Sequence, residues 1–192
     1  EMAALRESLK ADYGKLDILI HSIAYAPAAE MNNPFLETTR EGFNIALETS
    51  AYSLVAVARE LTPIMAEGSS IVTLTYLGSD RVFPKYNVMG VAKAALESAV
   101  RYLANDLGPE GIRVNAISPG PMKTLAGAAI GGARRTFRHT EANAPLRHNA
   151  TLEAIGGTAV WLASDWGACT TGEVVMVDSG YHILGMPQPD NL

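Results

Sequence analysis

The sequence has a single cysteine, no long apolar run and only a small excess of negative charge. One cysteine, Cys169, excludes a disulfide within the chain and is typical of a reducing cytoplasm. The first residues lack the basic and apolar regions of a secretory signal, and no run of about 18 apolar residues could form a transmembrane helix. A formal net charge of −5 argues against nucleic acid as the main partner. We therefore expect a cytoplasmic protein that binds neither nucleic acid nor a membrane, with Cys169 buried as a small apolar residue.

Two kinds of ligand-binding pattern are also missing. The histidines are scattered, and no spacing of histidine, cysteine and carboxylate residues is typical of a metal site. No strand-like segment is followed by a glycine-rich turn of the kind that holds a phosphate. With 192 residues, 48% of them apolar, the chain suits one domain with a sizeable core, and we expect it to hold no metal.

Segments with helical and strand patterns alternate along the chain. Apolar residues at helical spacing predict helices over 1–14, about 40–65 in one or two pieces, about 88–107 and 151–164. Short apolar or β-branched runs predict buried strands at 16–20, 70–75, 112–117 and 173–177. Residues 122–145 read as an irregular, partly helical insertion, and the tail 178–192 as loosely held. This alternation predicts an α/β fold, a doubly wound parallel sheet of about four strands with helices on both faces.

Polar residues gather at the carboxyl ends of the predicted strands. Residues 21–24 follow the first strand, Thr75 and Tyr76 the second, and 118–121 the third. In parallel sheets of this kind, ligands bind outside the carboxyl ends of the strands. We therefore predict a binding site at this edge of the sheet.

The most informative pattern is a tyrosine followed seven residues later by a lysine, Tyr86 and Lys93. Seven residues of helix turn about 700°, so the two side chains lie only ~20° apart around the helix axis. Helical side chains lean toward the N-terminus, which tilts the lysine toward the tyrosine. A phenol backed by an ammonium is suited to stabilise a developing oxyanion. Taken alone, a half-exposed tyrosine and a surface lysine on one helix explain the spacing equally well.

A set of short motifs spread along the chain carries a family resemblance. The motifs are His21-Ser22-Ile23, Arg40-Glu41-Gly42-Phe43, Ser50-Ala51-Tyr52-Ser53, Tyr86-Asn87-Val88-Met89 with Lys93, Val100-Arg101-Tyr102, Gly108-Pro109-Glu110-Gly111-Ile112-Arg113-Val114-Asn115-Ala116-Ile117-Ser118 and Gly172-Glu173-Val174-Val175. Over essentially its whole length the chain resembles the bacterial NADH-dependent enoyl-acyl-carrier-protein reductases, a divergent branch of the short-chain dehydrogenase/reductases. The spacing from Tyr86 to Lys93 is the most discriminating feature, since commoner members of that superfamily have three intervening residues, and Met89 stands where their tyrosine would be.

The resemblance implies an enzyme that reduces the trans-2 double bond of enoyl thioesters in fatty-acid synthesis. It implies NADH as the cofactor, with NADPH also open, a substrate carried on acyl carrier protein, and a homotetramer. The catalytic residues that it implies are Tyr76, Tyr86 and Lys93. The cofactor-binding residues that it implies are Ser22, Ile23, Thr75, Lys93, Gly120, Pro121, Met122 and Thr124. The substrate-binding residues that it implies are Ala24, Tyr76, Tyr86 and Met89.

The insertion at about 122–145 corresponds in the family to a substrate-binding lid. On this lid, Arg134, Arg135 and Arg138 would meet the acidic carrier protein. A solvated charged helix face explains three arginines within five positions equally well.

The sequence departs from the family pattern at its start. Judged by topology, residues 1–192 lack the first strand of the Rossmann-like domain, its phosphate-binding turn and the next two strands. We therefore expect a single Rossmann-type domain that is truncated at its N-terminus and binds a dinucleotide weakly by itself. Two alternatives remain open: a 3-oxoacyl (carbonyl) reductase of the commoner type, and a noncatalytic fragment that keeps only the fold and the oligomer contacts. Against the first alternative, Met89 stands where it needs tyrosine and Thr73 near where it needs serine.

Overall fold

A four-stranded parallel sheet forms the centre of the molecule. The computed structural model describes residues 2–123 and 133–191, and within them the strands pair in the order in which they occur along the chain. The register between β1 and β2 shifts once, between Leu16 and Ile18, and is then regular, with Ile20 opposite Val72, and Ile71 of β2 lies opposite Val114. The strands are β1 (Leu16–His21), β2 (Met65–Leu74), β3 (Arg113–Pro119) and β4 (Val174–Val177). The predicted α/β class, with four parallel strands, is confirmed.

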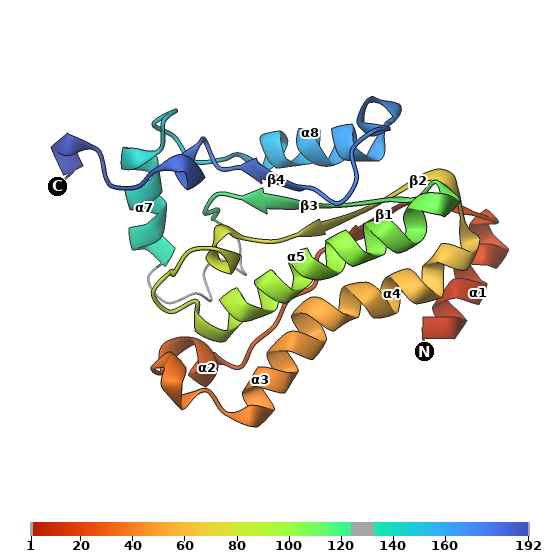
Figure 1. The fold of residues 1–192 in the computed structure, drawn as a ribbon, viewed down its shortest axis with the longest axis horizontal. Coiled ribbons are helices and arrows are strands. Elements are labelled where there is room, and N and C mark those ends of the chain that lie inside the picture. Colours follow the sequence, from red (N-terminus) through yellow and green to blue (C-terminus); the bar gives the residue numbers. More distant parts are fainter. Residues whose placement is uncertain (1, 124–132, 192) are drawn as a thin grey trace.

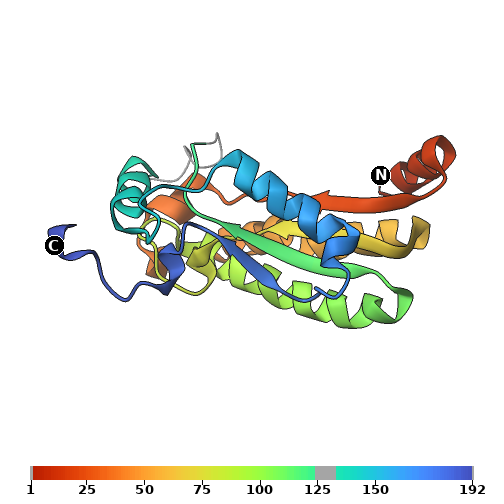
Figure 2. The same ribbon diagram turned by 90° about the horizontal axis from the view of Figure 1, so that it is seen from above.

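Helices cover both faces of the sheet, as Figure 1 and Figure 2 show. On one face α4 and α5 pack against the strands, and on the other face α8 packs on β2, β3 and β4. The helix predicted over 40–65 is in two α-helical pieces joined by a π-helical turn, Glu48–Tyr52. The helices are α1 (Met2–Tyr13), α2 (Ala28–Asn32), α3 (Arg40–Leu47), α4 (Ser53–Leu61), α5 (Asn87–Leu107), α7 (Ala133–Asn143) and α8 (Leu152–Ala163). Among the described segments, none of these helices is both long enough and apolar enough to cross a membrane.

The core lies in two apolar layers, one on each side of the sheet. Between the sheet and the α4–α5 face, Leu54, Leu96 and Val114 are completely buried. On the opposite face, Ile117 and Leu162 close a smaller cluster under α8. Each such side chain contributes about 1.5–3 kcal/mol by leaving water. These layers fix α5 and the two inner strands, β2 and β3, firmly relative to one another.

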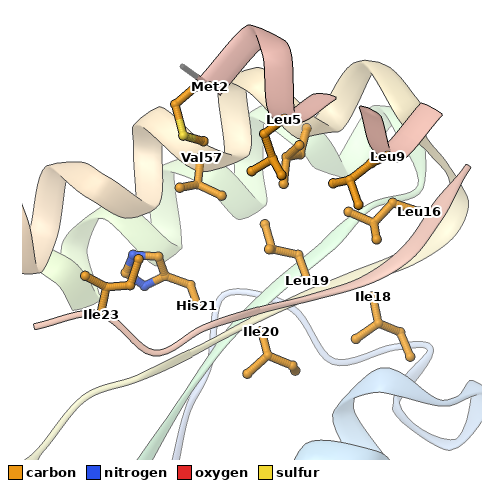
Figure 3. Close-up of a pocket in the computed structure, with 11 residues that line it drawn as sticks. Met2, Leu5, Leu9, Leu16, Ile18, Leu19, Ile20, His21, Ile23 and Val57 are labelled. Atoms are coloured by element: carbon orange, nitrogen blue, oxygen red, sulfur yellow. The ribbon is translucent and has the colours of Figure 1, made fainter. Parts of the chain in front are cut away.

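Strand β1 is less buried than its apolar sequence predicted. Ile18 is 46% exposed and Ile20 is 50% exposed, because α8 packs on β2, β3 and β4 and does not reach across to β1. In Figure 3 both isoleucines point away from α1 and α4, whereas Leu19 points toward those helices. An apolar groove runs along this edge, lined by Met2, Leu5, Leu9, Leu16, Ile18, Leu19, Ile20, His21, Ile23, Val57 and Leu61. The tyrosines and the lysine that the sequence singled out do not line this groove.

Three further expectations need correction. Strand β2 begins at Met65, five residues earlier than predicted, because Met65 already pairs with Leu16 before a turn centred on Gly68. Cys169 is exposed, because it follows a short 3-10 turn at the surface instead of packing into the core. The tail is also held more firmly than expected, since the Gln188 backbone N–H donates to Oδ1 of Asn143, in α7, at 2.8 Å.

The segment after β2 docks tightly on the first turn of α5. This segment is a 3-10 turn, Leu77–Ser79. A Cβ atom built on Gly90 would lie 2.6 Å from the carbonyl oxygen of Gly78, and a Cβ atom built on Gly78 would overlap the Tyr86 ring. Both positions therefore need glycine so that the backbone of this turn can reach α5. The contact brings the end of β2 to the start of α5, where the predicted site lies.

We expect Gly90→Ala to lower the free energy of unfolding by about 1–2 kcal/mol, because the overlap with Gly78 outweighs the gain in helix propensity. Gly156→Ala is the matched control, since Gly156 is also helical but a Cβ atom there would meet open space. That control should raise the free energy of unfolding by up to about 1 kcal/mol. Chemical denaturation measures both, and a Gly90→Ala protein as stable as the control would contradict the close contact.

Candidate functional site

Tyr76, Tyr86 and Lys93 come together at the carboxyl end of β2. Tyr76 follows β2 directly, Tyr86 caps the start of α5, and Lys93 lies two turns further along that helix. The rings of Tyr76 and Tyr86 meet edge to face, with centroids 5.0 Å apart and an interplanar angle of 66°. In Figure 1 the start of α5, α2 and α7 surround the carboxyl ends of the strands. The structure thus gathers the three predicted catalytic residues at the predicted edge of the sheet.

A strained backbone holds Tyr86 at the entrance of α5. Its two neighbours both have positive φ angles, 64° at Lys85 and 40° at Asn87. Asparagine tolerates this conformation better than most residues, whereas each such non-glycine residue costs on the order of 1–3 kcal/mol. The Asn87 side chain offsets the cost by donating to the carbonyl oxygens of Met31 and Asn33, at 3.1 and 2.8 Å. Strain of this kind concentrates at functional sites.

Lys93 is a buried ammonium fastened to the end of β2. Its side chain is 7% exposed, and Nζ donates to the carbonyl oxygen of Leu74 at 2.7 Å. Burial lowers the pKa of Lys93 to about 8, and the carboxylate of Glu97, one helical turn further on, opposes this shift. Glu97 in turn accepts a hydrogen bond from the Thr75 hydroxyl at 2.5 Å. Thr75, Lys93 and Glu97 therefore form one polar group at this edge.

Burial keeps both phenols in the protonated form. Burial is the main cause that raises the pKa of Tyr86, which is 6% exposed, and neighbouring Tyr76 and Glu97 raise it further. Burial also raises the pKa of Tyr76, with smaller contributions from Tyr181 and Asp178. A phenol with a raised pKa remains a hydrogen-bond donor at neutral pH. The site therefore offers two O–H donors and a nearby positive charge.

A second polar network holds the loop after β1. The π-helical turn presents Ser50, whose hydroxyl accepts from the Tyr25 N–H at 2.9 Å and donates to the Tyr25 carbonyl oxygen at 3.0 Å. Ser53, the first residue of α4, bonds Nε2 of His21, while Nδ1 of His21 bonds the Thr73 hydroxyl, both at 2.9 Å. Burial lowers the pKa of His21, and Lys93 lowers it further. The network anchors His21 and Tyr25, and it leaves Ser22, Ile23 and Ala24 exposed between them.

The loop after β3 contributes the remaining predicted cofactor-binding residues. Gly120 is buried, and a Cβ atom there would lie 3.1 Å from Cα of Asp178, so glycine allows this loop to meet the end of β4. Pro121 and Met122 follow it and are half-buried. Thr124 lies outside the described residues.

The remaining predicted site residues lie in two different environments, an apolar cluster and the exposed surface of α7. Met89 packs in an apolar cluster with Met31 and Tyr86, and is itself 7% exposed. The three arginines of α7 are all exposed, which suits either a docking surface or a solvated face: Arg134, Arg135 and Arg138. The predicted lid over 122–145 stays a prediction, because residues 124–132 are not described.

Several residues of the site were missed from the sequence. Glu97 follows Lys93 by four residues, a spacing that puts both on one helix face and could have indicated the pair. The close approach of Gly78 and Gly90 was harder to predict from the sequence than the pair Lys93 and Glu97. Asp178 and Tyr181 lie about a hundred residues from Tyr76 in the sequence, and only the sheet order brings them to the same edge.

The residues present fit the nicotinamide riboside half of a dinucleotide. An ammonium has three N–H donors, and the Leu74 carbonyl takes one, so Lys93 can still meet hydroxyl groups. Exposed Ser22 and Ile23, which the resemblance places along the adenosine ribose, lie at the end of β1, and the Gly120 loop follows β3. For the phosphates, the sequence contains no glycine-rich turn after a strand, so the expectation of weak binding by these residues alone stays a prediction.

Comparison with known proteins shows which protein family this chain is similar to. The family model described as enoyl-(acyl carrier protein) reductase matches residues 1–182. The enoyl-[acyl-carrier-protein] reductase [NADH] FabI of Aquifex aeolicus is 52% identical over 183 residues, which cover 95% of this chain and 68% of that protein. The FabI of Bacillus cereus is 51% identical over 185 residues, covering 96% of this chain and 72% of that protein.

Solved structures agree closely in fold. The Bacillus cereus enzyme with NADP+ and indole naphthyridinone superposes with a TM-score of 0.94 at 51% identity, over 97% of this chain and 72% of that chain. The enzyme of Anaplasma phagocytophilum in complex with NAD superposes with a TM-score of 0.93 at 43% identity, over 97% of this chain and 71% of that chain.

We expect Glu97→Gln to lower the pKa of Lys93 below about 8, because the carboxylate that favours the charged ammonium is removed while burial remains. NMR titration of the labelled lysine side chain measures this value. Glu110→Gln serves as the control, since Glu110 is exposed in the turn after α5 and should leave the titration of Lys93 unchanged. An unchanged pKa in Glu97→Gln would contradict the coupling between these two side chains.

Proposed function

This chain belongs to the enoyl-(acyl carrier protein) reductase family, and from this premise we propose that it reduces the trans-2 double bond of enoyl thioesters with NADH in fatty-acid synthesis. The observation that carries the proposal is the convergence of Tyr76, Tyr86 and Lys93 on the carboxyl end of β2. Reduction of a double bond conjugated to a thioester places negative charge on the carbonyl oxygen. A protonated phenol and a nearby ammonium are suited to stabilise that charge.

Each residue has a proposed role. The Tyr86 hydroxyl donates to the thioester carbonyl oxygen, and the Lys93 ammonium binds the ribose hydroxyls and adds positive potential. Tyr76 lines the pocket beside the thioester through its contact with Tyr86. The cofactor supplies the hydride when it is bound, while this chain orients the reactants and excludes water. Thr75, tied to Glu97, completes the polar wall at the ribose.

The proposed cofactor is NADH, with NADPH as the second candidate. The relatives from Aquifex aeolicus and Bacillus cereus carry NADH in their names, and a Bacillus cereus structure contains NADP+. The two dinucleotides share the nicotinamide riboside half. The residues of this chain that suit a dinucleotide, such as Thr75 and Lys93, would face that shared half.

A 3-oxoacyl reductase of the commoner type is a poorer candidate. Such an enzyme would need a donor hydroxyl at Thr73 and a tyrosine at Met89. The Thr73 hydroxyl is fully buried and donates to the carbonyl oxygen of His21 at 3.1 Å, so it turns toward β1. Met89 belongs to the apolar cluster around Tyr86. Neither position supplies the group that the alternative requires.

We also propose a cytoplasmic homotetramer. Exposed apolar residues support the assembly: Leu152 and Val160 on α8 are 65% and 66% exposed, and Trp166 just after that helix is 87% exposed. Exposed apolar side chains gathered on one element are typical of subunit interfaces. The exposed thiol of Cys169 suits a reducing compartment.

We expect Tyr86→Phe to lower the turnover of crotonyl thioester by about 10²- to 10³-fold, because the donor to the developing oxyanion is lost. The assay follows oxidation of NADH, with its concentration raised until the rate no longer increases. Tyr102→Phe is the control, since Tyr102 lies on the same helix, is 72% exposed and should keep full turnover. Undiminished turnover in Tyr86→Phe would remove Tyr86 from the mechanism, and no turnover in the unsubstituted chain would favour the noncatalytic alternative.

We expect Arg135→Glu to raise the KM for crotonyl-acyl carrier protein by roughly five-fold, because a charge that attracts an acidic partner is reversed. The KM for crotonyl-N-acetylcysteamine, a small neutral thioester, should not change. Arg101→Glu is the control, because Arg101 is exposed on α5 and not on α7. Equal effects of the two substitutions on the carrier-bound substrate would show that only overall charge matters.

A further inference from the structure

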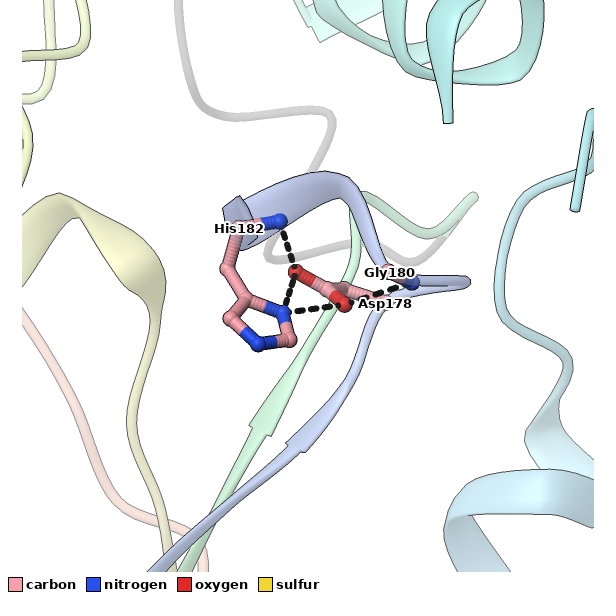
Figure 4. A network of polar contacts seen from close by, with 3 residues as sticks. All are labelled: Asp178, Gly180 and His182. Atoms are coloured by element: carbon pink, nitrogen blue, oxygen red, sulfur yellow. Dashed lines mark hydrogen bonds and ion pairs between the residues drawn. The ribbon is translucent and has the colours of Figure 1, made fainter. Parts of the chain in front are cut away.

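The carboxylate of Asp178 organises a tight turn at the end of β4, as Figure 4 shows. Asp178 is 4% exposed. Its Oδ1 accepts from the Gly180 N–H at 3.0 Å, and its Oδ2 accepts from the His182 N–H at 2.9 Å. Nδ1 of His182 lies 2.9 Å from Oδ1 and 3.1 Å from Oδ2. Because a carboxylate only accepts, Nδ1 carries the proton, and the two side chains hold the turn at both ends.

The turn needs this support, because its backbone is strained. Ser179 has a φ of 59° and Gly180 a φ of 81°, and the left-handed conformation is unfavourable for serine. A Cβ atom at Gly180 would lie 2.9 Å from Cγ of Pro145, so the turn is also packed against the segment that follows α7. The hydrogen bonds from Gly180 and His182 to Asp178 keep this conformation in place.

The turn carries Tyr181 to α7, at the edge of the sheet where Tyr76 also lies. The Tyr181 ring meets the His139 ring of α7 edge to face, with centroids 5.9 Å apart, and it lines a hollow with His139, Asn143 and Leu184. Tyr181 follows β4 and Tyr76 follows β2, so both lie at the carboxyl edge of the sheet, and Tyr181 makes a minor contribution, after burial, to the raised pKa of Tyr76. Burial raises the pKa of Tyr181 itself, so its hydroxyl stays a donor.

We propose that Tyr181 is a further substrate-binding residue, which contacts the thioester arm between the carrier protein and Tyr76, and that Asp178 and His182 position it. The inference rests on the proposed function. A substrate that is covalently attached to a carrier protein must extend from the docking surface to the reacting carbonyl. If the carrier docks on α7, as proposed, Tyr181 lies against that helix and at the same edge of the sheet as Tyr76. A neutral phenol there can donate to an amide or thioester oxygen of the arm.

Steady-state kinetics with crotonyl-acyl carrier protein and NADH test the proposal. We expect Tyr181→Ala to raise the KM for the thioester by about ten-fold and Tyr181→Phe, which keeps the ring against His139, by about three-fold. His182→Ala should raise the same KM by about five-fold, and His182→Asn, whose side-chain amide can replace Nδ1, should restore it. In all of these variants the KM for NADH should stay within two-fold. Ile183→Ala is the control, because Ile183 is 68% exposed in the same turn.

Thermal unfolding of each variant separates positioning from folding. An unchanged thioester KM in Tyr181→Ala would overturn the proposal while leaving the proposed function intact. The proposal would equally fall if His182→Ala lowered only kcat and the unfolding temperature, or if His182→Asn behaved like His182→Ala. An unsubstituted chain that reduces no enoyl thioester would overturn the proposed function first, and this inference with it.

Discussion

The contact between the Lys93 ammonium and the Leu74 carbonyl is the interaction on which the site depends. A buried ammonium is unfavourable unless polar groups replace the water that it loses. Here the carbonyl at the end of β2 and the carboxylate of Glu97 replace that water. These partners lie on a strand and on a helix that share a rigid apolar core. The sheet and α5 must therefore be assembled before the charge has a favourable position.

The contact between Lys93 and the end of β2 also explains why glycines and a strained backbone surround the site. For Lys93 to reach the end of β2, the backbone after that strand must lie directly against α5. Gly78 and Gly90 permit that approach, since a Cβ atom at either position would overlap its neighbour. The chain then has to enter α5 abruptly, and the positive φ angles beside Tyr86 result from that entry. The distorted backbone is thus part of what aims Tyr86 toward Tyr76.

Local patterns predicted most of the fold, and the exceptions arise from contacts distant in sequence. Helical spacing and short apolar runs identified the four strands and the long helices, and the spacing from Tyr86 to Lys93 predicted side chains that the structure places at the carboxyl end of β2. The exposure of Ile18 and Ile20 could not be read from their sequence, because it depends on how far α8 extends across the sheet. The bond from Thr75 to Glu97 likewise joins residues 22 positions apart. Such pairs become visible only when strand and helix are packed.

The proposed site has a buried centre, on β2 and α5, and an exposed side, on α7. Tyr76, Tyr86 and Lys93 stand on β2 and α5, whose relative position is fixed by fully buried side chains such as Leu96 and Val114. On α7, Asn143 is fully buried and bonds the tail, whereas Arg134, Arg135 and Arg138 are exposed. A rigid centre suits the precise placement of a hydride acceptor, whereas exposed charges suit the proposed partner protein, which must bind and leave in each turnover. The turn at Asp178 packs both on the segment around α7 and on the loop after β3, so its geometry would set how the proposed docking at α7 is aligned with the proposed chemistry at Tyr76.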